Sequence, residues 1–471
     1  MFRELPSVFI LFILTVISGC LFISCTQHSS EGMIVMTQID KDQETIAFGS
    51  TDNLSFFKGA KIMMMDPSNP ERKALLLSED FYAACSPDIS FDAKKMIFTG
   101  QRNEHDIWQI YEMDLTSLQY KPVTNSIENC TDPAYLPNNR IVYSKIINAE
   151  NGEKGKALFA STMDGKQEEQ ITFNPGYYAG TSMLHDGRII SMKGSSTPEP
   201  NRSKLMVMRP DGTKEMLFYK SEGDVQLIGK GRETENDEIY LLGKNEEGLG
   251  KLYAISYNNP LKSRKLIAEK AGGDFIGMSP LMNGHLLVCY RKSTEASYGL
   301  YELDPNNMKL VKSVFYDPSY KTIQAVAVEQ HKVPKKIPSE VNMEEQTGLL
   351  LCQDINFIGF HQDTMQTNGA KAVKIEILGI EASMGTVDVE KDGSVYLKIK
   401  ADTPFQLQTL NEDGDIMNGP SSWITLRPNE RRACVGCHQG NEVVPENKQP
   451  LSVLKEPIQI PREPKLLAGR E

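Results

Sequence analysis

The chain has 471 residues and a formal net charge of −11, with 51 lysines and arginines against 62 aspartates and glutamates. This length allows two or three domains with substantial cores, and the acidic balance without a basic tract argues against nucleic acid as a partner. The eight cysteines are too few for a scaffold of this size built on disulfides.

The N-terminus has the pattern of an export signal that ends at a lipid-modified cysteine. Arg3 precedes an apolar run, Val8–Ile17, and small residues then lead to Cys20 and Cys25. Both cysteines follow residues that resemble the box cleaved in bacterial lipoproteins. Cys25 is favoured because the polar stretch Thr26–Gly32 follows it, whereas apolar residues follow Cys20. The pattern predicts an exported protein, anchored by lipid to the bacterial cell envelope on its periplasmic or surface side.

A strand-like apolar segment then recurs about every 48 residues. Its copies contain Ile46, Ile97, Ile141, Ile189, Ile239 and Leu287. A second strand follows each copy, several of these strands end in Asp-Gly or Asp-Pro turns, and a third strand comes after the turn. Six such units predict a six-bladed β-propeller, which a leftover strand at Ile323–Val328 would close. The units resemble the TolB-type repeat, notably in Ser86–Asp92 and Ile107–Asp114.

Two propeller cysteines occupy equivalent places in adjacent units. Cys85 precedes Ser86-Pro87-Asp88, and Cys130 precedes Thr131-Asp132-Pro133. Either they form a disulfide between neighbouring inner loops, or they are two small buried residues.

After a linker-like stretch, Val333–Glu340, the pattern is again that of strands. Predicted strands cover Leu349–Cys352, Val373–Leu378, Val395–Ile399 and Phe405–Gln408. Together they predict a small β-sandwich-like module, so the whole fold class is all-β.

The final segment of this module contains Cys434-Val435-Gly436-Cys437-His438, the attachment pattern of c-type haem. The thiols of Cys434 and Cys437 would add to the two vinyl groups of the porphyrin, and His438 would then lie beneath the iron as an axial ligand. One covalent haem c is the predicted cofactor. Export supports this assignment, because c-type haem is attached outside the cytoplasm.

Two other readings of the motif stay open. The same three side chains could hold zinc with one further ligand, for instance Cys352. A dithiol redox pair is the other alternative, although the motif does not begin a helix after a strand.

The C-terminal motifs resemble a known family. They are Gly385–Tyr396, Asn418–Trp423, Arg427–His438 and Pro445–Asn447. Together they look like the middle, haem-binding domain of hydrazine synthase alpha-subunit-like proteins, which also carry a propeller before the haem module. The resemblance implies that Cys434 and Cys437 bind haem covalently.

The ligand on the other face of the iron is not decided by the sequence. Met417 and His361 lie in the predicted haem domain, as does Met384. A methionine or histidine there would favour electron transfer, whereas an open position would permit chemistry on small molecules. Arg431 and Arg432 could pair with the haem propionates or be solvated.

The leading functional prediction is a lipid-anchored monohaem c-type cytochrome-like protein that passes electrons to a redox partner protein, with the propeller as docking or cover domain. One alternative is a haem oxidoreductase with an open iron site, related to hydrazine synthase alpha. The other is a propeller binding protein that holds zinc at the CxxCH motif. No hydrolase triad or phosphate loop stands out, and whether the protein is an enzyme stays open.

The predicted divisions are a signal peptide (1–25), a tether (26–42), the propeller (43–330), a linker (331–345) and the haem-binding domain (346–471). Because the linker is short and contains proline, we also expect one mouth of the propeller to pack against the haem domain.

Overall fold

The computed structural model describes residues 30–43, 57–148, 154–194, 203–221, 225–234, 236–357, 371–435 and 448–461. Strands dominate these segments, which also contain short 3-10 turns such as η2 (Glu269–Ala271) and η3 (Leu451–Leu454). The prediction of an all-β chain is thus confirmed. Across the described residues, no helix has the length and apolar character needed to cross a membrane.

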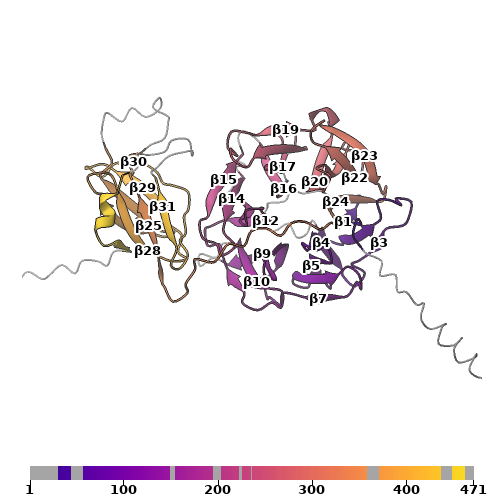
Figure 1. Ribbon diagram of the computed structural model, residues 1–471, viewed down its shortest axis with the longest axis horizontal. Helices are drawn as coiled ribbons and strands as arrows, with labels where there is room; N and C mark the ends of the chain where they lie inside the picture. The colour runs from indigo at the N-terminus through magenta and orange to yellow at the C-terminus, as the bar shows by residue number, and fades with distance from the viewer. Residues whose placement is uncertain are drawn as a thin grey trace, which may run out of the picture.

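The strands up to β24 form a ring of groups of four strands, the arrangement of a β-propeller (Figure 1). Two of these groups are joined into one sheet by a parallel bridge between Lys156 and Tyr177. The first three groups are β24 (Tyr320–Ala327), β1 (Ile34–Asp40), β2 (Lys61–Met65) and β3 (Leu75–Leu76); β4 (Ala83–Ile89), β5 (Lys95–Gln101), β6 (Gln109–Asp114) and β7 (Tyr120–Pro122); β8 (Cys130–Leu136), β9 (Arg140–Asn148), β10 (Lys154–Thr162) and β11 (Glu169–Gln170). The next three are β12 (Tyr177–Met183), β13 (Ile189–Gly194), β14 (Lys204–Met208) and β15 (Met216–Lys220); β16 (Gln226–Glu233), β17 (Glu238–Lys244), β18 (Gly250–Ser256) and β19 (Lys265–Ile267); β20 (Asp274–Pro280), β21 (Leu286–Arg291), β22 (Gly299–Asp304) and β23 (Lys309–Phe315). We call these groups blades one to six.

The recurring segment of the sequence is the second strand of a blade. Its copies lie in β5, β9, β13, β17 and β21. In blade one the second strand is β1, not the predicted copy around Ile46, which falls outside the described residues. The predicted closing strand is β24, which pairs antiparallel with β1, Ile34 opposite Ala327. β1 itself lies inside the stretch 26–42 that the sequence suggested as a tether. Ile34, Val35 and Met36 are buried there, because ring closure gives this isolated apolar run a partner strand.

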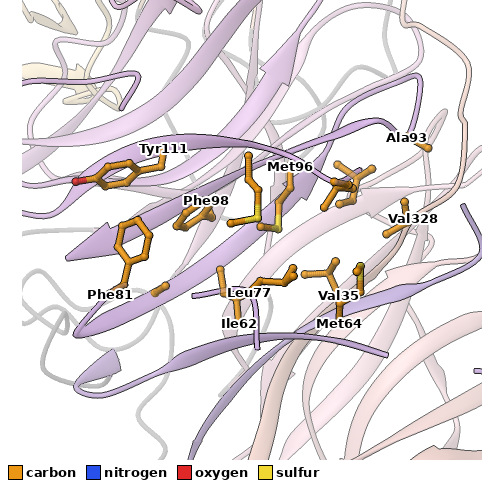
Figure 2. Packing of buried hydrophobic residues seen from close by; sticks show 14 residues of the cluster. Val35, Ile62, Met64, Leu77, Phe81, Ala93, Met96, Phe98, Tyr111 and Val328 are labelled. Carbon is orange, nitrogen blue, oxygen red and sulfur yellow. The ribbon is translucent and has the colours of Figure 1, made fainter. Parts of the chain in front are cut away.

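Neighbouring blades share their cores. Figure 2 shows one such cluster, in which Val35 and Ile62 of blade one face Met96 and Phe98 of blade two. Phe81 lies edge-on to Phe98, with ring centroids 5.2 Å apart, an arrangement that aromatic rings favour. Burial of apolar surface between blades is therefore the main force that holds the ring together.

Ion pairs also join inner strands of blades that are not neighbours. Lys230 of β16 pairs with Asp132 of β8 at 3.2 Å, and Arg232 of β16 pairs with Asp88 of β4 at 3.5 Å. Blade five is thus tied to blades three and two. Asp132 also accepts a hydrogen bond from the backbone of Thr181 in blade four, at 3.1 Å.

The C-terminal module consists of two four-stranded sheets. One has the order β31 (Arg431–Cys434), β25 (Thr347–Cys352), β28 (Val395–Lys400) and β32 (Ile458–Ile460); the other has the order β27 (Ser383–Asp388), β26 (Lys374–Leu378), β29 (Gln406–Leu410) and β30 (Ile416–Asn418). Alternating residues of both sheets, such as Leu350, Leu397, Ile375 and Ile377, enclose one apolar core. The module is therefore the β-sandwich that the strand pattern predicted.

Candidate functional site

The first residue of the CxxCH motif ends a strand of the sandwich. Cys434 is the last residue of β31, which runs parallel to β25 with Leu350 beside Arg432 and Cys352 beside Cys434. Its side chain is partly buried against the sandwich core, and this burial raises the pKa of the thiol, although the charge of Arg432 opposes the shift.

The remaining predicted haem and metal residues are placed as follows. Cys437, His438 and His361 lie outside the described residues, as do Cys20 and Cys25. Met417 lies in β30 and packs, partly buried, against the same core as Cys434. Within the part of the chain that the structure describes, no three His, Cys, Asp or Glu side chains form a group that could hold a metal ion.

The two propeller cysteines in equivalent places of adjacent blades are not bonded to each other. Cys85 and Cys130 are buried as free thiols, so the alternative of two small core residues holds. Burial raises the pKa of Cys130 to about 11 and raises that of Cys85 further still. A thiol that keeps its proton is a poor nucleophile, and both residues therefore have a packing role.

The sandwich is fastened to the propeller by a buried arginine that sequence reasoning did not single out. Arg427 is 2% exposed and its guanidinium bonds to three groups: the backbone oxygen of Asp211 (3.1 Å), the carboxylate of Asp402 (2.9 Å) and the carboxylate of Glu169. Its guanidinium also lies 5.0 Å from the ring centroid of Phe173. Because Asp211, Glu169 and Phe173 belong to the propeller, Arg427 joins both units by charge, hydrogen bonds and a cation–π contact.

A buried glutamate completes this junction. Glu430 is fully buried and accepts hydrogen bonds from the backbone nitrogens of Arg427 and Lys214, both at 2.9 Å. It also pairs with Arg432 at 2.7 Å. The side chain of Arg432 thus pairs with a carboxylate inside the protein. Lys214 of the propeller donates to the backbone oxygen of Arg431, the first residue of β31.

These contacts lie at the outer edge of blades three and four. They come from the end of β11 and from the hairpin between β14 and β15, which Figure 1 shows on the side of the ring that faces the sandwich. Among the described residues, the contacts that we find thus involve the outer strands of blades three and four, contrary to the expectation that a mouth of the propeller packs on the haem domain. The junction is also at the opposite end of β31 from Cys434, about 10 Å away at the usual rise per strand residue.

The linker is bound along the propeller rather than free. The backbone nitrogen of His331 donates to Phe91, and that of Lys335 donates to His185. Arg209 pairs with Glu340 and donates to the backbone of Pro338. No pattern in the sequence marks these contacts, because single polar residues from distant segments create them.

The ionised carboxylate of Asp211 binds the end of the linker through hydrogen bonds. Burial opposes its charge, but hydrogen bonds from Thr213, Ser339 and the backbone of Glu340 outweigh that effect and lower the pKa below the ordinary 3.8. A lowered native pKa adds stability that is complete above pH 3.8 and is lost as the pH falls through the native value. We expect protease cleavage within 331–345 to accelerate at that acidic limit, and Asp211→Asn to remove much of this pH dependence. Identical pH profiles of the two proteins would contradict this assignment.

The chain is thus a β-propeller protein with a C-terminal β-sandwich. A bound linker joins the two units, and strand β31 of the sandwich leads into a CxxCH motif. Residues 323–439, which include the whole motif, match the hydrazine synthase alpha subunit middle domain. The chain aligns with hydrazine synthase subunit alpha of Kuenenia stuttgartiensis over 513 residues at 21% identity. This alignment covers 82% of this chain and 63% of that protein. The chain thus spans less than two thirds of the relative.

The solved structure of Kuenenia stuttgartiensis hydrazine synthase has the same fold. It superposes with a TM-score of 0.76 at 18% identity, over 90% of this chain and 71% of that one. TolB from Acinetobacter baumannii aligns with a TM-score of 0.44 at 13% identity, over 70% of this chain and 74% of that one. The chain is thus similar to hydrazine synthase alpha, and its residues 323–439 match the middle domain of that subunit, as its C-terminal motifs indicated.

Proposed function

We propose that this protein is an exported haem protein with one covalent haem c, held by Cys434 and Cys437 and ligated by His438. The observation that carries the proposal is the match of residues 323–439 to the hydrazine synthase alpha subunit middle domain, which contains the complete CxxCH motif.

The surroundings of Cys434 suit such a group. Its backbone is held in the sheet by β25, and its partly buried sulfur lies at the edge of the apolar sandwich core. A porphyrin needs apolar surface for its macrocycle and soft or imidazole ligands for its attachment and iron, and the motif supplies two thiols and one imidazole. When bound, the haem supplies a one-electron redox centre.

Two roles follow from the ligand on the other face of the iron. With Met417 or His361 in that position, the protein passes single electrons to a redox partner protein. With an open position it acts as a haem oxidoreductase on a small molecule, a role supported by its relation to a protein named hydrazine synthase. That relative is named as a subunit, which also supports a partner protein for this chain.

The test is a visible spectrum of the full chain produced with haem-maturation machinery. We expect the absorption bands of a c-type haem and haem staining of the denatured full-length band. Addition of cyanide separates the roles, since an open iron changes its spectrum at once and an iron with Met417 or His361 bound changes it slowly. A colourless protein with stoichiometric zinc would refute the proposal and support the zinc alternative.

Membrane anchoring through Cys25 is a separate proposal. The polar stretch Thr26–Gly32 supports it as a spacer between lipid and propeller, and Ser30 is the first residue that the structure describes. Labelled palmitate is expected to enter the wild-type protein and to be lost in Cys25→Ala. Loss of the label in Cys20→Ala instead would assign the lipid to Cys20.

A further inference from the structure

The sandwich brings a third thiol beside the first cysteine of the CxxCH motif. Cys352 ends β25 and Cys434 ends β31, and the two residues are direct neighbours across this parallel pair. Inward and outward residues alternate along both strands, and Leu350, Cys352 and Cys434 all contact the sandwich core. Both sulfurs therefore point to the same side of the sheet.

This placement meets the backbone requirement for a disulfide. Neighbouring strands lie about 4.7–4.9 Å apart, and bonded cysteines usually have Cα atoms about 4.4–6.8 Å apart. The backbone nitrogen of Gln353 donates to the oxygen of Cys434 at 2.9 Å, so the sheet remains paired up to and beyond the two cysteines. Closing the bond therefore requires rotation of the side chains and a small shift of strand ends, without reordering of the chain.

The two thiols differ in exposure, and because burial raises the pKa of Cys434, exchange at this thiol speeds up as the pH rises. Cys352 is 6% exposed, whereas Cys434 is only partly buried and is followed by the rest of the motif. An external disulfide can thus reach Cys434 first, and the buried thiol of Cys352 can then resolve the mixed disulfide.

We infer that Cys352 and Cys434 form a reversible disulfide in the exported chain before haem is attached. The two thiols lose two protons and two electrons, and the disulfide reagent that accepts them becomes two thiols. The bond would occupy the sulfur that the proposed thioether needs. If the proposed haem function is correct, reduction of this bond therefore precedes haem attachment. The disulfide itself does not depend on that function.

The test uses the full chain without haem, treated with oxidised glutathione, alkylated in acid and digested for mass spectrometry. We expect a cross-linked peptide that contains Cys352 and Cys434 and is lost on reduction. Cys352→Ser should lose this species, whereas Cys289→Ser, which changes a thiol buried in the propeller core, should retain it.

Three outcomes would overturn the inference. They are alkylation of both thiols after oxidation, a Cys434–Cys437 bond as the main product in the wild-type protein, and protection of both thiols by bound zinc with no disulfide formed. If the disulfide forms but the matured protein carries no haem, the proposed function fails while this inference stands. If the matured protein carries haem but no such disulfide forms, this inference fails while the proposed function stands.

Discussion

Cys434→Ala and Cys437→Ala are each expected to reduce covalent haem to a small fraction of the wild-type level. Each substitution removes one of the two sulfurs that would join the protein to the porphyrin in the proposed haem site. His438→Ala should act differently, because both thioether sulfurs remain and only the axial imidazole is lost. Haem staining after denaturing electrophoresis measures the covalent group, and the visible spectrum measures the change of ligand.

The matched control for these variants is Cys289→Ala. Cys289 is a buried cysteine in β21 of the propeller, far along the chain from the motif, and its replacement should leave haem staining unchanged. Full staining of Cys434→Ala and Cys437→Ala would show that the motif does not attach haem. Met417→Ala is informative in the same assay, since it changes the reduced spectrum only if Met417 binds the iron.

Arg427→Ala is expected to detach the sandwich from the propeller. The substitution removes a buried guanidinium and leaves Asp402 and Glu169 without their shared partner. Loss of one member of a buried ion pair costs roughly 3–5 kcal/mol, and we expect about 3 kcal/mol here because the two carboxylates keep some contact with water. Calorimetry should show the sandwich unfolding at a lower temperature, and limited proteolysis should cleave the linker faster.

Arg431→Ala is the control for that variant. Arg431 is also an arginine of this segment, but its side chain is exposed, and its backbone oxygen still accepts the bond from Lys214. Its replacement should change stability by less than about 0.5 kcal/mol. If Arg427→Ala and Arg431→Ala unfold alike, the buried network does not hold the two units together. Glu430→Gln tests the carboxylate of the same junction, because it retains the shape of the side chain and removes the charge that pairs with Arg432.

The fold could be predicted because its signals are local and repeated. The segment around Ile97 recurs in β5, β9, β13, β17 and β21 with the alternation and turn residues of a strand, and burial of apolar side chains in these strands enforces that pattern. The CxxCH motif could also be recognised in the sequence, since it consists of five consecutive residues. β1 escaped detection as part of the propeller because its partner, β24, comes almost 300 residues later in the chain, and its place depends on ring closure.

The junction and the thiol pair were decided by tertiary structure alone. Arg427 and Glu430 were visible in the sequence only as part of a polar motif, and their partners Glu169 and Lys214 lie in the propeller. Pairing between them requires both units to be folded and in contact, a condition that no local pattern records. The sequence by itself determined the blades, the sandwich strands and the CxxCH motif, because periodic burial and the spacing of a short motif act over a few residues. Only the folded chain decided which end of the sandwich meets the propeller and that Cys352 lies beside Cys434, because strand register brings together residues far apart in sequence.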